Sequence, residues 1–249
     1  IRDNASSRGL GYVYKRQQKE ASLNLMTVKF EKLKKTIIKC NKCPRLVRFR
    51  KKISTEKRKQ YMDQTYWGKP VTGFGDINGK IMIVGLAPAA HGGTRTGRVF
   101  TGDKSSDFLY KCLHNVKIAN QSNSDHINDG LKIKNTFITP ALKCVPPGDK
   151  PLNEELKNCF GYFKSEFEIL KNLKIIVALG KIAFDTCVKF YRENFDYTER
   201  VKFSHGTYFK LPNNVLLMGC YHPSPRNVNT GRINEKQMTK LFKKVKELV

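Results

Sequence analysis

Four cysteines are spaced as ligands of a metal ion or a metal cluster. Cys40 and Cys43 form a Cys-x2-Cys pair, and its short turn directs both sulfurs to one side. Cys144 ends a predicted strand, and Cys159 lies early in the helix predicted to follow. Four thiolates bind either zinc or an iron–sulfur cluster. Because zinc sites more often carry two such pairs, the single pair favours a cluster over zinc, and unliganded thiols are the remaining interpretation.

The segment GLAPAAHGGTRTGRVFTGD, residues 85–103, is the second place where chemistry is expected, and we call it the glycine-rich loop. Its five glycines let the backbone approach a ligand closely. It lacks the GxxxxGKS/T and GxGxxG patterns of phosphate-binding loops. Arg95 and Arg98 are nevertheless predicted to contact phosphates. Phe100 is interpreted either as a core side chain or as a platform on which a planar base stacks.

Two residues are candidates for catalysis. Asp103 is the only carboxylate of the glycine-rich loop, and it either positions a water molecule or caps the helix that begins at KSSDF. His222 follows the fourth predicted strand and precedes Pro223. An imidazole there either donates a hydrogen bond to a carbonyl oxygen that gains charge as a base departs, or is a structural loop residue.

His222 and its neighbours form a short, stiff turn, which we call the histidine turn (residues 221–227). We predict that it presses on a phosphate or wedges into a stack of bases. The residues that would do so are Ser224, Pro225, Arg226 and Asn227.

The hydrophobic pattern predicts the framework that positions these groups. Strands are predicted at residues 80–85, 136–142, 174–179 and 215–219, and helices at 23–38, 45–64, 105–116, 153–170, 181–191 and 233–248. This alternation predicts an α/β fold, a three-layer α/β/α sandwich with a central four-stranded parallel sheet. In such sheets ligands bind beyond the carboxyl ends of the strands, where the glycine-rich loop and the histidine turn both begin.

The charge of the chain indicates its partner. The 249 residues include 47 Lys and Arg against 21 Asp and Glu, a formal net charge of +26. This excess predicts nucleic acid as a partner, because basic side chains release the counterions condensed on phosphates. A solvated lysine-rich surface is the alternative.

Other features of the composition bound the class of protein. No apolar run reaches the roughly 18–20 residues that span a bilayer, and no export leader is recognised, so we expect a cytoplasmic protein. Cysteines in that setting are not expected to form disulfides, and Cys112, Cys187 and Cys220 are predicted to be buried. Residues 1–18 lack apolar periodicity and are predicted to be a non-native or disordered extension, which leaves residues 19–249 as a single domain.

Five motifs together closely resemble the uracil-DNA glycosylase superfamily, and its fifth family best, from about residue 33 onward. They are CNKCPRL, YWGKPVTGFGD, GLAPAAHGGTRTGRVFTGD, ALKCVPP and YHPSPRN. The resemblance implies that a base flipped out of DNA stacks on Phe100, with His222 at the leaving oxygen and the histidine turn in the minor groove. It also implies a 4Fe–4S cluster held by Cys40, Cys43, Cys144 and Cys159.

Two positions depart from the wider superfamily. Ala87 stands where several relatives carry a polar or acidic residue that serves the water, and the resemblance then assigns that role to Asp103. Thr139 and Pro140 stand where some relatives place a base-reading asparagine, so strict selection of uracil is not expected. The base is predicted to contact Gly85, Leu86, Ala87, Pro88, Phe100 and Asn227.

We therefore expect a monomeric DNA-repair glycosylase that hydrolyses the N-glycosidic bond of uracil, and also of hypoxanthine and xanthine, and leaves an abasic site. No lysine is placed for Schiff-base chemistry, so strand cleavage is not expected. One rival is a non-catalytic iron–sulfur or zinc domain that binds nucleic acid, which would not need both loops. Another is a radical or electron-transfer enzyme, against which the missing CxxxCxxC spacing argues.

Overall fold

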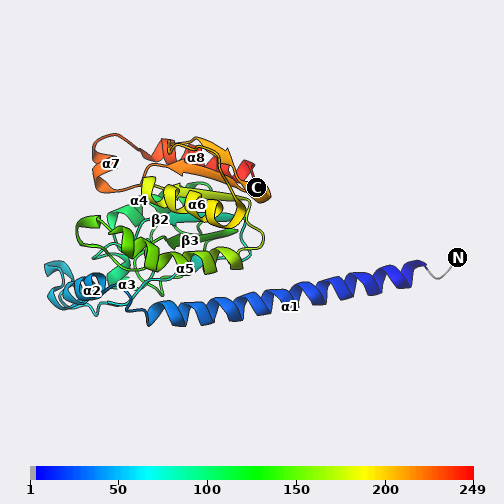
Figure 1. Cartoon of the computed structure of the whole chain (residues 1–249), viewed down its shortest axis with the longest axis horizontal. Helices are drawn as coiled ribbons and strands as arrows, with labels where there is room; N and C mark the ends of the chain where they lie inside the picture. Colours follow the sequence, from blue (N-terminus) through cyan, green and yellow to red (C-terminus); the bar gives the residue numbers. More distant parts are fainter. Residues whose placement is uncertain (1–3) are drawn as a thin grey trace.

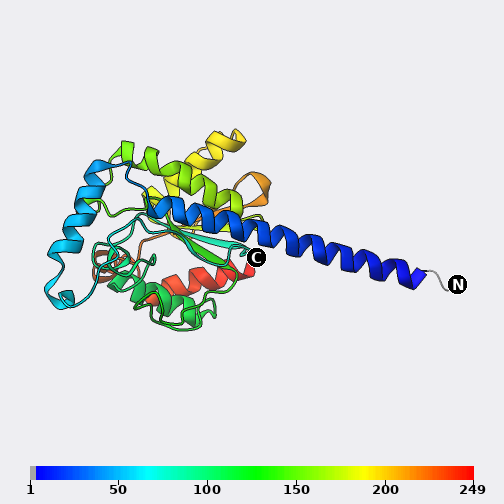
Figure 2. The same ribbon diagram turned by 90° about the horizontal axis from the view of Figure 1, so that it is seen from below.

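The computed structural model of the chain describes residues 4–249, and before residue 23 it describes the side chains of residues 17, 18 and 21 alone. The predicted extension, residues 1–18, therefore lies partly outside the described residues, and the domain boundary stays a prediction. From Asn4 onward its backbone belongs to helix α1 (Asn4–Ile38), which starts earlier than the predicted residue 23. In Figures 1 and 2 the later part of α1 lies along α5 (Asn153–Ile169), and its earlier part projects from the body of the fold.

The sheet has a parallel centre and two antiparallel edges. Its strand order is β1-β3-β2-β4-β6-β5, and the four central strands pair in parallel as predicted. The central strands are β2 (Ile81–Gly85), β3 (Thr136–Pro140), β4 (Ile175–Leu179) and β6 (Leu216–Cys220), and the edges are β1 (Phe74–Gly75) and β5 (Tyr208–Lys210). The sheet therefore has six strands rather than the predicted four. The edges were missed because β1 has two residues and β5 is largely exposed, so neither forms an apolar run.

Helices cover both faces of the sheet, so the predicted three-layer architecture is confirmed (Figure 1). Successive residues of a strand point to opposite faces. Ile83 accordingly packs in the core beneath α4 (Lys104–Asn115) and α8 (Glu235–Glu247), whereas Met82 packs in the core beneath α5 and α6 (Lys181–Phe195). Burial on both faces explains why the central strands are continuous apolar runs.

The predicted helix at residues 45–64 is shorter in the structure. Helix α2 (Pro44–Glu56) ends where Lys57 adopts a positive φ of 50°, and a short 3-10 helix, η1 (Lys59–Tyr61), follows. The other short elements are α3 (Gly93–Thr96), α7 (Pro225–Asn229), η2 (Pro147–Asp149) and η3 (Pro212–Asn214). Among the described residues, no helix has both the length and the apolar character that crossing a membrane requires.

A buried ion pair fixes the carboxyl end of β3. Lys143 and Glu166 are both buried, and Lys143 Nζ lies 2.6 Å from Glu166 Oε2. Lys143 Nζ also donates to Thr139 Oγ1 (2.7 Å) and to the carbonyl of Pro140 (2.8 Å). Glu166 Oε1 accepts the N–H of Gly73 at 3.0 Å, in the loop YWGKPVTGFGD that we call the approach loop (residues 66–76). Each charge therefore has several partners, as buried charges require.

Removing one member of this pair should lower the free energy of unfolding more than removing both. Glu166→Ala leaves the Lys143 ammonium buried and unpaired, so we expect the free energy of unfolding to fall by about 3–5 kcal/mol. The double variant Lys143→Met with Glu166→Leu contains no buried charge and should lose less. Urea denaturation of the three proteins measures this, and equal losses in both variants would contradict the explanation.

Candidate active site and cysteine cluster

The glycine-rich loop begins at the carboxyl end of β2 and places the Phe100 ring against Gly85. A Cβ on Gly85 would lie 2.8 Å from carbons of the Phe100 ring, so only glycine lets the ring approach the backbone there. Phe100 has a positive φ of 47°, a strained conformation for an aromatic residue. The side chain is buried in the core, and its ring centre lies 5.9 Å from that of His222. Phe100 is thus a core residue at the edge of the site, and its stacking on a base stays a prediction.

The histidine turn starts at the carboxyl end of β6 and is braced from within. Asn227 Nδ2 donates to the carbonyl of His222 at 2.9 Å, and Ser224 Oγ accepts the N–H of Asn227 at the start of α7. The Asn227 amide nitrogen is thus used inside the turn, and the predicted contact with the base is left to its oxygen. Pro225 and Arg226 are exposed at the tip, as a wedge or a phosphate contact requires.

Burial of His222 lowers the pKa of its imidazole to about 4. The ring is therefore neutral near pH 7 and carries one N–H donor and one acceptor nitrogen. Among the described residues, no side chain forms a hydrogen bond with this ring. His222 is therefore a neutral donor beside Phe100, where the sequence predicted a group to stabilise a departing base.

Asp103 caps a helix and also presents a carboxylate oxygen to the loop. Its Oδ1 accepts the N–H groups of Ser105 (2.9 Å) and Ser106 (3.0 Å) at the start of α4, so the capping interpretation is correct. Its Oδ2 lies against Gly92, where a Cβ would overlap it, and accepts no hydrogen bond within the described part of the chain. Burial raises the pKa of Asp103 although both N–H bonds lower it. The cap and the water-positioning role can therefore use different oxygens of one side chain.

Arg95 holds the glycine-rich loop together instead of extending from it. Its Nε donates to the carbonyl of His91 (2.7 Å), Nη1 to Gln64 Oε1 (2.6 Å) and Nη2 to the carbonyl of Gly102 (2.8 Å). The guanidinium also stacks on the Tyr61 ring, 3.9 Å from its centre. All three of its nitrogens are thus used inside the protein, so the predicted phosphate contact is not favoured.

Arg98 is buried, and the prediction that it contacts phosphates is wrong for this structure. Its guanidinium forms an ion pair with Asp129, whose side chain is 5% exposed, and hydrogen bonds with Thr101 Oγ1 and Ser124 Oγ, both at 2.9 Å. Burial raises the pKa of Asp129, but hydrogen bonds from Arg98 and from backbone N–H groups outweigh it and bring that pKa to about 2. Arg98 therefore anchors the loop that contains Ser124 and Asp129.

His91 and Tyr66, which were not among the predicted site residues, join two loops. Tyr66 Oη lies 3.0 Å from His91 Nδ1. The pKa of His91 is lowered by burial and then by the charges of Arg58 and Arg95. His91 is the only histidine in the glycine-rich loop, and this is the one signal in the sequence by which it could have been found.

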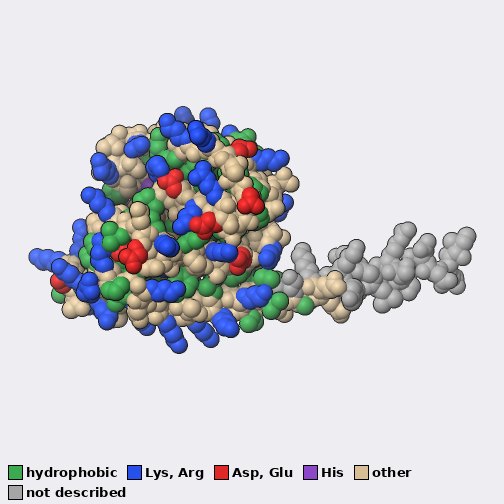
Figure 3. Space-filling view, viewed as in Figure 1, with side chains coloured by type: hydrophobic (Ala, Val, Ile, Leu, Met, Phe, Trp, Pro, Cys, Tyr) green, Lys and Arg blue, Asp and Glu red, His purple; other side chains and the backbone are tan. Residues whose placement is uncertain are grey.

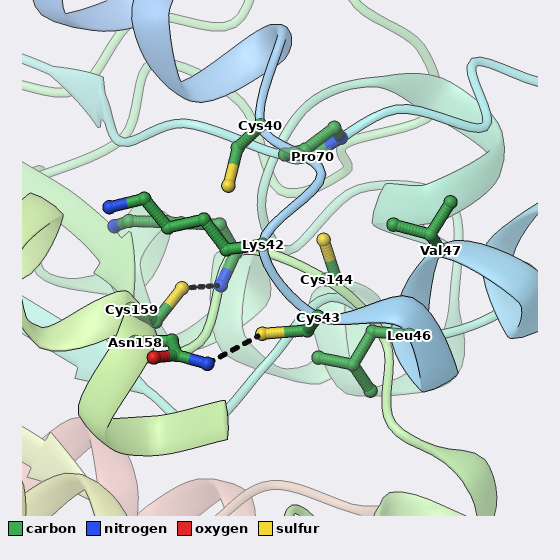
Figure 4. Close-up of a pocket in the computed structure, with 10 residues that line it drawn as sticks. Cys40, Lys42, Cys43, Leu46, Val47, Pro70, Cys144, Asn158 and Cys159 are labelled. Carbon is green, nitrogen blue, oxygen red and sulfur yellow. Dashed lines mark hydrogen bonds between the residues drawn. The ribbon is translucent and has the colours of Figure 1, made fainter. Parts of the chain in front are cut away.

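The four predicted ligand cysteines line one pocket, and their sulfurs point into it (Figure 4). Cys40 follows α1, Cys43 caps α2, Cys144 follows β3 and Cys159 lies in α5. Two groups donate to the sulfurs: Asn158 Nδ2 to Cys43 (3.7 Å) and the N–H of Lys143 to Cys159 (3.2 Å).

Burial of the thiols of Cys144 and Cys159 makes their ionisation costly. It raises the pKa of Cys144 to about 12, with Cys159 as the next contributor, and the pKa of Cys159 to about 11. Among the described residues, no three His, Cys, Asp or Glu side chains are grouped closely enough to hold a single metal ion. Cys112, Cys187 and Cys220 are fully buried, as predicted.

Arg50 links the cysteine pocket to the glycine-rich loop. This buried side chain donates to the carbonyls of Cys40 (3.2 Å) and Gly68 (2.8 Å). The N–H of Gly68 in turn donates to the carbonyl of Thr94, and that of Trp67 to the carbonyl of Arg95. The approach loop is therefore hydrogen-bonded to both segments, and it fixes the position of the glycine-rich loop relative to the segment that contains Cys40.

The lowered pKa of His222 should make the folded protein less stable in acid. The unfolded chain takes up this proton near pH 6.5, whereas the folded protein takes it up only near pH 4. Between these values the unfolded state binds more protons, so stability falls as pH falls through that window. His222→Gln should lose less stability than the natural protein between about pH 7 and about pH 5. If urea denaturation shows that the natural protein and His222→Gln lose the same stability between these two pH values, His222 is not buried as a neutral group.

Comparison with known proteins adds an independent observation. A family model described as the Uracil DNA glycosylase superfamily matches residues 72–246. The Type-5 uracil-DNA glycosylase of Mycobacterium leprae is 40% identical over 210 residues, which cover 84% of this chain and 91% of that protein. The Type-5 enzymes of Pyrobaculum aerophilum and Thermus thermophilus are 38% and 36% identical, over 84% and 86% of this chain and 88% and 95% of theirs.

Proposed function

The chain belongs to the uracil-DNA glycosylase superfamily, and from that membership we propose that it removes uracil from DNA by hydrolysing the N-glycosidic bond. One structural observation carries the proposal. Phe100 and a neutral His222 lie side by side where two loops leave the carboxyl edge of a parallel sheet, and the loop that contains Phe100 ends at the Asp103 carboxylate. A non-catalytic nucleic-acid-binding domain, the rival prediction, would not need this combination.

The reaction separates charge, and each of these side chains has a part in it. As the bond to the sugar breaks, negative charge grows on the base oxygens and positive charge on the sugar. The neutral imidazole of His222 donates to the base oxygen. Asp103 Oδ2 orients the water and stabilises the positive sugar, and Phe100 holds the flipped base by stacking. Leaving the DNA stack costs the base about a few kcal/mol, and least when it is mispaired.

The range of bases follows from the environment of Thr139. Its hydroxyl donates to Glu166 Oε2 and accepts from Lys143 Nζ, so it is used within the buried ion-pair network. No side-chain amide stands there to distinguish uracil from other bases. We therefore propose that hypoxanthine and xanthine are also removed, with the base held by Gly85, Leu86, Ala87 and Pro88.

We propose that the cysteine pocket holds a 4Fe–4S cluster. Four thiols from three segments of the chain line it, and two N–H donors reach its sulfurs, a donor set that suits an iron–sulfur cluster. The cluster would supply a structural cross-link between the end of α1, the start of α2 and α5. Through Arg50 and the approach loop, this link keeps the glycine-rich loop in place.

DNA is the proposed partner, and we propose that the protein acts on it as a monomer in the cytoplasm. The wedge that enters the minor groove would be the exposed pair Pro225 and Arg226. Ser224 contributes by capping α7 and so fixing the direction of the turn.

Excision is tested on a duplex oligonucleotide that carries a single uracil. The natural protein should leave abasic sites that alkali cleaves. Asp103→Asn should lower the single-turnover rate by about 10²-fold or more, because asparagine keeps the cap but lacks the charge. Asp103→Ala should lose both the rate and roughly 1 kcal/mol of stability.

Two outcomes would count against this assignment. If the natural protein produces no abasic sites at any salt concentration, the proposed function is wrong. If Asp103→Asn cleaves as fast as the natural protein while Asp103→Ala is only less stable, Asp103 is a cap and has no part in the reaction.

The cluster is tested by metal content. Protein prepared without oxygen should contain about four irons per chain. Cys40→Ala should lower both the iron content and the melting temperature, because it removes a ligand of the cross-link. Cys187→Ala, which changes a buried cysteine outside the pocket, is the matched control and should keep its iron. Stoichiometric zinc without iron would contradict the proposal.

A further inference from the structure

Besides buried Arg50, residues 45–64 contain basic side chains that have been given no part in binding DNA so far. They include exposed side chains on α2 and on the segment that follows it. The two arginines predicted to bind phosphates, Arg95 and Arg98, are used inside the protein. Phosphate contacts must therefore come from other basic residues near the site.

Helix α2 presents its basic side chains outward. Leu46 and Arg50 are buried on its inner face, and Arg48 and Lys51 lie on the exposed side, three residues apart and thus on neighbouring turns. Lys52 is paired with Glu56 at 3.7 Å. Within the described part of the chain, no acidic side chain pairs with Arg48 or Lys51.

The segment after α2 is exposed and basic, and it packs directly on the glycine-rich loop. The N–H of Arg58 donates to Tyr66 Oη, which contacts His91 Nδ1. Tyr61, two residues after exposed Lys59, lies beneath the Arg95 guanidinium. These contacts fix Arg58 and Lys59 at the border of the site, and neither is paired with an acidic side chain among the described residues.

The views of the molecule agree with this placement. In Figure 1, α2, α3 and α7 lie at the same end of the fold, beyond the carboxyl ends of the strands. In Figure 3, Lys and Arg side chains gather at the part of that end where α2 lies. The wedge of the histidine turn and the basic residues of α2 thus border one edge of the sheet.

We propose that Arg48, Lys51, Arg58 and Lys59, the basic flank, bind backbone phosphates of duplex DNA beside the base that is removed. The proposal rests on the proposed function, since it places the phosphates next to that site. Unpaired cations at a fixed position increase the affinity of a protein for DNA, because they release counterions from the phosphates, and this gain does not depend on the DNA sequence. The flank would therefore hold both damaged and undamaged DNA against the wedge.

The test is the salt dependence of binding to an undamaged duplex, with the cluster-loaded protein. Two variants each remove two charges: Arg48→Gln with Lys51→Gln, and Arg58→Gln with Lys59→Gln. Each should bind more weakly at low salt, and each should flatten the slope of log K against log salt by about 1.8, since one phosphate contact contributes about 0.9. Melting temperatures measured on the same preparations exclude unfolding.

The matched control is Lys171→Gln with Lys174→Gln. These exposed lysines precede β4, at the opposite edge of the sheet, and should leave the slope unchanged. If the flank variants keep the natural slope, or if the control flattens it equally, the basic flank is not a phosphate site. Binding is measured without excision, so the two proposals can fail separately. If the flank variants flatten the slope but the natural protein removes no uracil, the proposed function is wrong and the phosphate-binding role of the basic flank still stands.

Discussion

The ion pair between Lys143 and Glu166 joins three parts of the molecule that would otherwise be independent. Its charged atoms hold the end of β3 and the approach loop, while the backbone N–H of Lys143 donates to Cys159 and its carbonyl accepts from Val71. A buried pair of this kind tolerates little movement, because displacing either partner leaves an uncompensated charge. The cysteine pocket and the loops of the site are therefore held in one position relative to the sheet.

The site itself is assembled by side chains that each satisfy a structural need as well. Asp103 caps α4 with one oxygen and presents the other to Gly92. Phe100 closes the core but keeps a left-handed backbone that brings its ring to Gly85. Such a conformation persists only where the surroundings determine it, which here are the core on one side and the braced glycine-rich loop on the other. Preorganisation at this edge thus comes from packing in the core and from the hydrogen bonds that brace the loop.

The sequence predicted most accurately what burial alone decides. The central strands were found because both of their faces are covered, and the four cysteines because a Cys-x2-Cys pair with two further cysteines beside predicted elements is typical of a metal or cluster site. The environments of single side chains were harder to predict. Arg98 looks like a phosphate contact until Asp129, thirty-one positions away, is seen to pair with it. For Asp103 the two interpretations were treated as alternatives, since a sequence does not distinguish the two oxygens of a carboxylate.

The free cations described above lie at the border of the candidate site, whereas the basic groups within it are hydrogen-bonded inside the protein or neutral. This distribution of charge suits the proposed reaction. Although the net charge is +26, the arginines of the glycine-rich loop are used inside the protein and His222 is neutral. In the proposed reaction a free cation near the sugar would oppose the positive charge that grows there, whereas the Asp103 carboxylate would favour it. A neutral donor can still stabilise the departing base. The cations proposed to bind phosphates lie at the border, where they would attract DNA without raising the energy of the reacting sugar, so affinity and chemistry could change independently.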